Sequence, residues 1–164
     1  MVSVIFSQIT HRSEYNQSMK AREFELPDQF GKTHKLSDYK GQWVVLYFYP
    51  HDDTPGCTKE ACNFRDSIDK FEKLGAVILG VSKDSVASHK KFVDKYHLNF
   101  TLLSDESHKV INEYKSWGVK KFMGREFEGT IRNTYLINPK GEIDKFYEKV
   151  NPLTHADQIL KDIK

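Results

Sequence analysis

Apolar runs alternate with amphipathic stretches along most of the chain, and this alternation predicts an α/β fold. Residues 43–50 (WVVLYFYP) and 76–82 (AVILGVS) are near-continuous runs rich in β-branched and aromatic side chains. Such runs are typical of strands buried on both faces of a sheet. Shorter stretches at 23–28 and 100–103 predict two further strands, and residues 131–148 predict a β-hairpin that turns at PKGE.

Helical periodicity fills the intervals between these strands. Apolar residues from Ala61 to Leu74 recur at three- and four-residue steps and predict a helix that ends at Gly75. Ser85 is placed to cap a second helix that reaches about His97, and residues 107–114 and 153–163 predict two more helices. The order β-α-β-α-β, then a hairpin and a helix, predicts a thioredoxin-like fold with a central mixed β-sheet flanked by helices.

The length of 164 residues fits a single domain, which we place at residues 21–164. Residues 1–20 lack clear periodicity and are interpreted as an N-terminal extension.

Charge and hydropathy exclude several classes of protein. The 25 Lys and Arg residues nearly balance the 23 Asp and Glu residues, which argues against nucleic-acid binding through bulk charge. No apolar run approaches the roughly 20 residues that span a bilayer, so no membrane association is expected. The N-terminal segment lacks the basic region of a secretory signal. These features predict a cytoplasmic protein whose two cysteines are reduced at rest.

Cys57 follows the end of a predicted buried strand and begins a predicted helix, with a turn expected at Pro55-Gly56. The unsatisfied N–H groups and partial positive charge of a helix N-terminus stabilise a thiolate. Because the thiolate is the nucleophilic form of cysteine, Cys57 is the candidate reactive residue.

Cys62, five residues later, points in a different direction from Cys57. In a helix the two side chains diverge by about 140°, and their Cα atoms lie roughly 8–9 Å apart. A disulfide needs Cα atoms within about 7 Å. The pair therefore predicts a two-step reaction. Cys57 reacts first, and local unwinding of the helix then brings it to Cys62.

Other interpretations of the pair are open at this point. The two cysteines could be unrelated free thiols. A metal site is weaker, since C-x4-C has no second ligand pair, and the histidines His51, His89, His97 and His108 share no local frame and are expected to be mostly solvated. The spacing disfavours a C-x-x-C oxidoreductase. We expect no metal and no cofactor.

The stretch YFYPHDDTPGCTKEACNFRD resembles the peroxiredoxins, and among them the bacterioferritin-comigratory protein (Bcp) or PrxQ group. The family signature P-x-x-x-T-x-x-C falls on Pro50, Thr54 and Cys57, and the second cysteine of the group falls on Cys62. The resemblance runs from about Glu23 to the C-terminus, and the arginine that the family uses falls on Arg132 in GTIRNTYLIN. Ala21-Arg22 replaces the usual Ala-Pro pair, and residues 1–18 have no counterpart; Met19 begins the family-like segment.

The resemblance implies reduction of hydrogen peroxide and organic hydroperoxides. Cys57 would attack the peroxide, Thr54 and Arg132 would stabilise the leaving oxygen, and Pro50 would shape the pocket. Cys62 would resolve the oxidised Cys57 as an intramolecular disulfide, and thioredoxin or a similar dithiol would reduce it. Such a protein needs no partner subunit, so a monomer is expected.

The sequence leaves open two alternative functions and the role of Glu60. A peroxide sensor or a protein active only in thiol–disulfide exchange would use the same cysteines, although the P-x-x-x-T-x-x-C context argues against both. Glu60 either holds an arginine or a backbone N–H, or is an ordinary acidic residue in the first helical turn.

Overall fold

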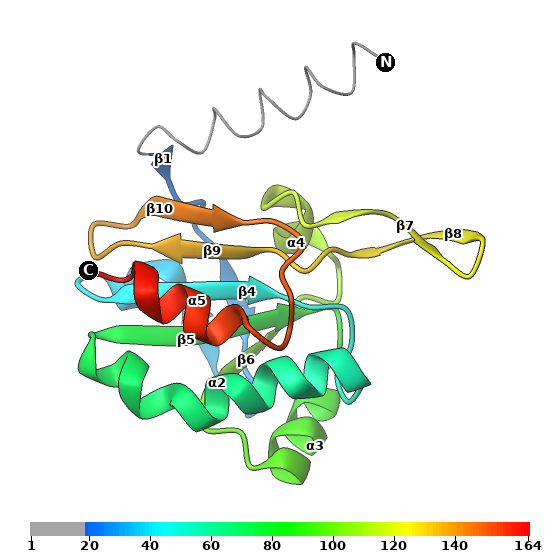
Figure 1. Ribbon diagram of the computed structural model, residues 1–164, viewed down its shortest axis with the longest axis horizontal. Coiled ribbons are helices and arrows are strands. Elements are labelled where there is room, and N and C mark those ends of the chain that lie inside the picture. The colour runs from blue at the N-terminus through cyan, green and yellow to red at the C-terminus, as the bar shows by residue number, and fades with distance from the viewer. Residues whose placement is uncertain (1–18) are drawn as a thin grey trace.

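A six-stranded mixed sheet organises the chain in the computed structural model, which describes residues 19–164 (Figure 1). The strand order is β1-β10-β9-β4-β5-β6. Strands β4, β5 and β6 run parallel, whereas β9 is antiparallel to β4 and β10 is antiparallel to β9. The sheet strands are β1 (Met19–Lys20), β4 (Trp43–Phe48), β5 (Ala76–Ser82), β6 (Thr101–Ser104), β9 (Thr134–Ile137) and β10 (Glu142–Tyr147). The predicted thioredoxin-like fold with a central mixed sheet is confirmed.

Strand β4 lies at the centre of the sheet because both of its faces are apolar. Side chains alternate between the two faces of a strand. Val45 and Tyr47 accordingly belong to one core cluster, and Val44, Leu46 and Phe48 belong to the other. All five are at most 2% exposed, as the continuous apolar run predicted.

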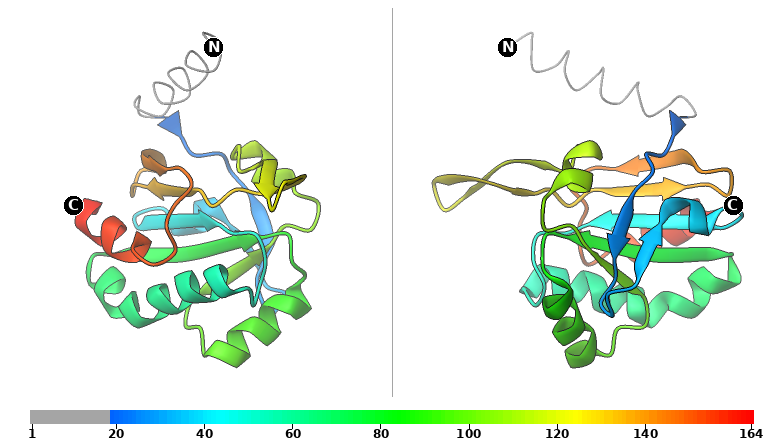
Figure 2. Two further views of the ribbon diagram at one scale, coloured as in Figure 1. Left: turned by 45° about the vertical axis from the view of Figure 1, so that its right-hand side comes forward. Right: turned by 180° about the vertical axis from the view of Figure 1, so that it is seen from behind.

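Helices cover both faces of the sheet. Figure 1 shows α5 in front of the strands and α2 running below β5, and the views of Figure 2 place β2, β3 and η1 on the opposite face. The side chains of α2, α3 and α5 contribute to the first cluster, and those of η1 and α4 contribute to the second. The helical elements are α2 (Pro55–Lys73), α3 (Val86–Tyr96), α4 (Lys109–Glu113), α5 (His155–Asp162) and the 3-10 helix η1 (Leu36–Tyr39).

The predicted helix ends match the sequence signals. Ser85 caps α3, because its hydroxyl accepts a hydrogen bond from the Ser88 N–H at 3.1 Å. Gly75 follows the end of α2 with φ of +69°, a conformation that costs glycine little.

Two short hairpins lie outside the sheet and were incompletely predicted. The strand expected at residues 23–28 is β2 (Glu25–Pro27), and it pairs with β3 (Thr33–Lys35). The β7–β8 hairpin, formed by β7 (Trp117–Phe122) and β8 (Arg125–Thr130), was not predicted and projects from the body at the right of Figure 1. Most of its residues are exposed, so no buried face imposes an alternating pattern on its sequence.

The N-terminal boundary of the sheet lies earlier than predicted. Met19 pairs with Ile143 and Lys20 pairs with Glu142, so these two residues belong to the sheet and not to an extension. The rest of the predicted extension, residues 1–18, lies outside the described residues.

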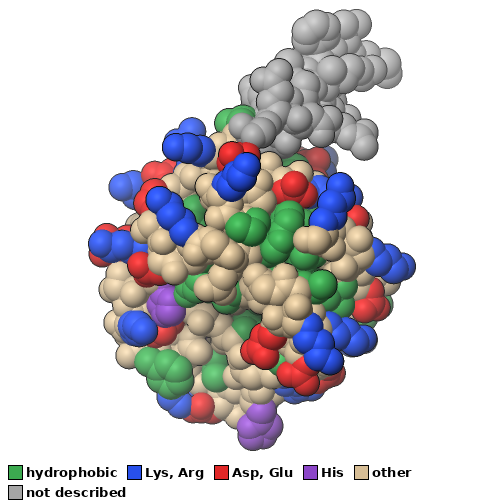
Figure 3. All heavy atoms as spheres, turned by 90° about the vertical axis from the view of Figure 1, so that its left-hand side faces the viewer, with side chains coloured by type: hydrophobic (Ala, Val, Ile, Leu, Met, Phe, Trp, Pro, Cys, Tyr) green, Lys and Arg blue, Asp and Glu red, His purple; other side chains and the backbone are tan. Residues whose placement is uncertain are grey.

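The surface of the described domain carries charges of both signs. Lys and Arg are interspersed with Asp and Glu on the face opposite the β7–β8 hairpin (Figure 3). Between residues 19 and 164, no helix has the length and apolar character required to cross a membrane.

Candidate active site

Cys57 lies in the first turn of α2, immediately after the central strand β4. Thr54 is the N-cap residue and Pro55 the first helical residue, so Pro55-Gly56 belongs to the helix and does not form a separate turn as predicted. The fixed φ of proline suits this first helical position. The Cys57 side chain is buried, with 2% exposure, and its thiol is free.

Arg132 approaches Cys57 from the segment between β8 and β9. Its Nη2 donates to Cys57 Sγ at 3.0 Å. The backbone of Arg132 is anchored, because its carbonyl accepts from the Val150 N–H at 2.9 Å. A fixed guanidinium at this distance favours the negatively charged form of the sulfur.

Gly56 leaves the space through which Arg132 reaches the sulfur. A Cβ atom at Gly56 would lie 2.9 Å from Arg132 Nη2. Any larger residue would therefore have to displace the end of the arginine side chain.

Glu60 is a buried acid one helical turn after Cys57, with 1% exposure. Arg132 Nη1 donates to Glu60 Oε1 at 3.4 Å, which settles the open question of Glu60 in favour of arginine contact. Burial raises the pKa of Glu60 to about 7, and the charge of Arg132 opposes this rise. Glu60 Oε2 has no hydrogen-bond partner among the described residues, so the carboxylate is incompletely compensated.

Thr54 and Pro50 lie in the segment that connects β4 to α2. The Thr54 hydroxyl donates to the His51 carbonyl at 3.1 Å, which fixes the loop before α2. Pro50 is half-buried just after β4. The hydroxyl of Thr54 would have to rotate away from His51 to donate to a bound peroxide.

Cys62 lies on α2 and is half-buried, with a free thiol. Both cysteines are within the continuous helix, so their Cα atoms are separated by roughly 8–9 Å, beyond the reach of a disulfide. The next residue, Asn63, donates its side-chain amide to the carbonyls of Pro152 and Leu153, each at 3.2 Å. This contact ties the helix, just past Cys62, to the segment that leads into α5.

An open groove of about 380 Å³ leads to Arg132. Sequence reasoning missed Lys120, because it lies on the unpredicted strand β7. Its Nζ donates to the Thr130 carbonyl at 2.9 Å, and burial, followed by the charge of Arg132, lowers its pKa. The groove is lined by Val119, Lys120, Lys121, Ile131, Arg132, Lys149 and Val150.

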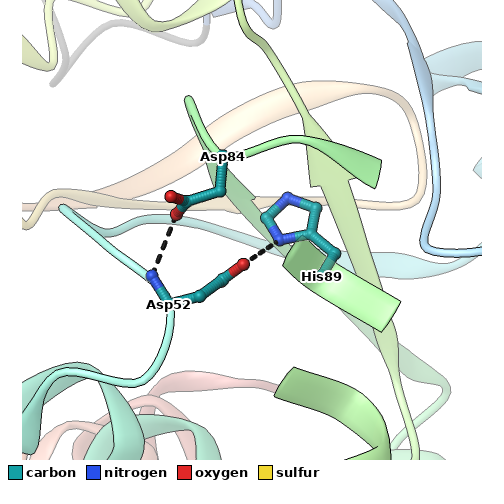
Figure 4. Close-up of side chains that lie close together, drawn as sticks. All are labelled: Asp52, Asp84 and His89. Atoms are coloured by element: carbon teal, nitrogen blue, oxygen red, sulfur yellow. Dashed lines mark hydrogen bonds and ion pairs between the residues drawn. The ribbon is translucent and has the colours of Figure 1, made fainter. Parts of the chain in front are cut away.

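Asp52, Asp84 and His89 form a group whose ligand-type atoms lie within 4.8 Å of one another (Figure 4). His89 is fully buried and is therefore an exception to the expectation that the four histidines are mostly solvated. The reason is a buried carboxylate that sequence spacing could not reveal: His89 Nδ1 lies 2.7 Å from Asp52 Oδ2.

Protein donors already surround the carboxylates of this group. Asp52 accepts from Tyr49 at 2.6 Å and from Ser88 at 2.8 Å, in addition to His89. Asp84 accepts from the Asp52 N–H at 2.9 Å and from Ser82 at 2.7 Å. These hydrogen bonds explain why the three side chains lie together. They attach the loop between β4 and α2 to the neighbouring elements β5 and α3.

Comparison with known proteins agrees with this fold. Residues 18–146 match the AhpC/TSA family. "Peroxiredoxin Bcp" of Bacillus subtilis is 48% identical over 145 residues, which cover 88% of this chain and 92% of the relative. "Peroxiredoxin Q, chloroplastic" of Triticum aestivum is 50% identical over 142 residues, which cover 86% of this chain and 63% of that protein.

A solved structure is similar over most of its length. The bacterioferritin comigratory protein of Xanthomonas campestris, described for its alkyl peroxide reduction activity, superimposes with a TM-score of 0.81 at 36% identity. The match covers 85% of this chain and 89% of that chain.

The chain therefore belongs to the AhpC/TSA family and is a peroxiredoxin, a member of a class of peroxidases. Within that class it falls in the Bcp/PrxQ group.

Proposed function

We propose that this peroxiredoxin is an atypical two-cysteine peroxidase in which Cys57 is oxidised by the substrate and Cys62 resolves it. The observation that carries the proposal is the 3.0 Å contact between Arg132 Nη2 and the Cys57 sulfur at the N-terminus of α2. A guanidinium and a helix N-terminus together stabilise the attacking thiolate and the negative charge that develops on the leaving oxygen.

In the first step, the Cys57 thiolate attacks the distal oxygen of the peroxide. The S–O bond forms as the O–O bond breaks; sulfur loses two electrons, and the leaving oxygen departs as hydroxide or alkoxide and takes a proton from solvent. Arg132 and the Cys57 N–H stabilise the leaving oxygen, and the Thr54 hydroxyl joins them after rotation. Pro50 shields the sulfur from bulk water.

In the second step, the first turns of α2 open and Cys62 attacks the sulfenic acid. The S–S bond forms, the sulfur–oxygen bond breaks, and water leaves. The half-buried position of Cys62 supports its later meeting with an external dithiol, which we propose to be thioredoxin or a similar protein.

Hydrogen peroxide and organic hydroperoxides are the proposed substrates. The groove beside Arg132 is partly apolar, through Val119, Ile131 and Val150, and can accommodate an alkyl chain. The alkyl peroxide reduction described for the Xanthomonas campestris relative supports this choice. We further propose that the enzyme works as a monomer in the cytoplasm, in antioxidant defence.

Two variants test the division of roles between the cysteines. Cys57→Ser is expected to abolish peroxide consumption with thioredoxin as reductant. Cys62→Ser should retain one rapid oxidation of Cys57 per molecule and lose sustained turnover with thioredoxin. Stopped-flow measurement of peroxide consumption distinguishes the two, and full steady-state turnover by the Cys57→Ser protein would refute the proposal.

A further inference from the structure

Helix α3 holds both ends of the segment that has to rearrange during the proposed reaction. At the start, the Asp52 carboxylate accepts from the Ser88 hydroxyl and from His89 Nδ1, both on α3. At the end, Arg65 Nη1 donates to the Tyr96 carbonyl at 2.6 Å. Residues 54–62, which carry Cys57 and Cys62, lie between these two attachments.

We infer that the Asp52–His89 pair is a positioning device for the peroxidase site, which holds the first turns of α2 folded and sets how readily they open for Cys62. The inference rests on the proposed two-cysteine mechanism. It assigns a role to Asp52 and His89, neither of which touches the reacting sulfur.

The bonds of His89 make this attachment strong. Its Nε2 lies 3.0 Å from the Leu103 carbonyl and its Nδ1 lies 2.7 Å from Asp52 Oδ2. A carbonyl and a carboxylate both accept hydrogen bonds, so each ring nitrogen of His89 faces an acceptor. His89 is 0% exposed and the Asp52 side chain is 5% exposed, so this contact is shielded from water.

A second contact reinforces the start of the segment from the protein surface. Asp53 accepts from Lys95 Nζ at 2.7 Å and from the Tyr96 hydroxyl at 2.6 Å. Asp53 and Lys95 are both largely exposed, so this pair is expected to contribute much less than the buried one.

Loss of one partner of a buried hydrogen-bonded contact leaves the other group unsatisfied and is destabilising. In Asp52→Asn the loop that ends at the N-cap Thr54 loses this attachment. The folded start of α2 then becomes less favourable relative to the opened form. Peroxide reacts with the folded form, whereas Cys62 reacts with the opened form, so the two steps should respond in opposite directions.

Competition between two fates of oxidised Cys57 reports on the second step. The sulfenic acid either loses water to Cys62 and gives the disulfide, or attacks a second peroxide and becomes sulfinic acid. The sulfinic product gains one oxygen while that peroxide is reduced to water. The fraction of sulfinic acid per turnover falls when opening becomes easier, and it does not depend on the rate of the first step.

The experiment compares Asp52→Asn with Asp94→Asn, which makes the same chemical change in an exposed ion pair on α3. Each variant is made in the otherwise natural protein and in a Cys62→Ser background. Reaction of Cys57 with hydrogen peroxide is measured by competition kinetics in the Cys62→Ser background. Sulfinic acid per turnover is measured by mass spectrometry with both cysteines present.

For Asp52→Asn, the rate constant with peroxide should fall about 10- to 100-fold, the scale of a small displacement in an active site. Its sulfinic fraction should fall as well, while Asp94→Asn changes neither. A folded Asp52→Asn protein with both quantities unchanged would overturn the inference, as would a rise in its sulfinic fraction. Should Asp52→Asn not fold, Ser88→Ala removes one donor to Asp52 and should move both quantities in the same directions, less far.

Failure of the proposed two-cysteine mechanism can be distinguished from failure of the inference about Asp52. If the parent protein forms no Cys57–Cys62 disulfide, the two-cysteine mechanism is wrong, yet the peroxide step in the Cys62→Ser background still tests the role of Asp52. A slower peroxide step there supports positioning by Asp52, and an unchanged one contradicts it.

Discussion

The guanidinium of Arg132 reaches the Cys57 sulfur past a residue that has no side chain. Gly56→Ala would place a Cβ 2.9 Å from Arg132 Nη2, and the flexible end of the arginine would have to move. Alanine is favoured over glycine in a helix by roughly 1 kcal/mol. The substitution should therefore leave stability unchanged or raise it, while the reaction of Cys57 with peroxide slows about 10- to 100-fold.

A double-mutant cycle identifies Arg132 as the cause of the slower reaction. In an Arg132→Ala background, Gly56→Ala should have little further effect on the peroxide rate constant, because the side chain that it displaces is absent. Equal effects of Gly56→Ala with and without the arginine would show that the glycine acts through something else.

The charge of Glu60 gives the native protein a pH dependence of its own. Its pKa of about 7 exceeds the ordinary value of 4.5, so between these values the native state holds a proton that the unfolded chain has lost. The contribution of Glu60 to stability is therefore complete below pH 4.5 and is lost as the pH rises to 7, by about 3 kcal/mol.

Glu60→Gln should remove this loss. Relative to the unmodified protein, the variant should gain stability as the pH rises from 5 to 8, measured as the free energy of unfolding in urea. Glu72→Gln, an exposed position on the same helix, is the matched control. A constant difference between Glu60→Gln and the parent across this range would contradict the titration.

Residues of the site were predictable where a motif fixes them, and unpredictable where tertiary contacts do. Cys57 and Cys62 follow from their place and spacing on a predicted helix, Pro50, Thr54 and Arg132 follow from the resemblance, and the structure places Arg132 against Cys57. The burial of His89 depends on Asp52, which lies 37 residues away in sequence, so no local pattern indicates it.

At the scale of elements, α5 docks on the sheet through a buried histidine. His155 Nε2 lies 2.7 Å from Thr134 Oγ1 on β9, and the ring packs against Tyr147 and Phe64. Burial lowers the pKa of His155 to about 4, from 6.5. Between these values the unfolded chain binds a proton that the native state excludes, so stability is lost as the pH falls from 6.5 to 4.

His155→Gln should reduce this sensitivity to acid. Between pH 7 and pH 5 the unmodified protein should lose about 2 kcal/mol through His155, and the variant should not. Urea denaturation at both pH values measures the difference, with the exposed His97→Gln as control. An identical acid response in His155→Gln and the parent would show that α5 does not carry this titration.

The elements with a buried face were the ones that the sequence predicted well. Strand β5 has the predicted bounds, and α3 begins after the predicted cap Ser85. The β7–β8 hairpin is mostly exposed, and its sequence lacks the alternation that burial imposes. The groove residue Lys120 was missed with it.

For the whole molecule, the titrations of the buried Glu60 and His155 have opposite effects on the free energy of unfolding. Acidification from pH 7 to pH 5 stabilises the fold through Glu60 and destabilises it through His155, each by about 2 kcal/mol. Their sum is small, so the two variants described above should diverge in opposite directions from a parent with a nearly flat response.

The contacts of α2 with the rest of the chain would keep the proposed opening of its first turns local. The end of the opening segment is tied to α3 by Arg65 and to the segment before α5 by Asn63, and its start is tied to α3 by Asp52. The sheet and the second core cluster can therefore persist while the first turns of α2 rearrange, and Cys57 and Ala61 are the members of the first cluster that would move.

The most direct test of the account is a mass spectrum of the reduced protein after one equivalent of hydrogen peroxide, with remaining free thiols alkylated. We predict the loss of two hydrogens, mapped to a Cys57–Cys62 disulfide and reversed by thioredoxin. Oxidation of Cys57 to sulfenic or sulfinic acid with Cys62 still alkylated would contradict the resolving role of Cys62. Two free thiols after exposure to peroxide would contradict the peroxidase mechanism itself.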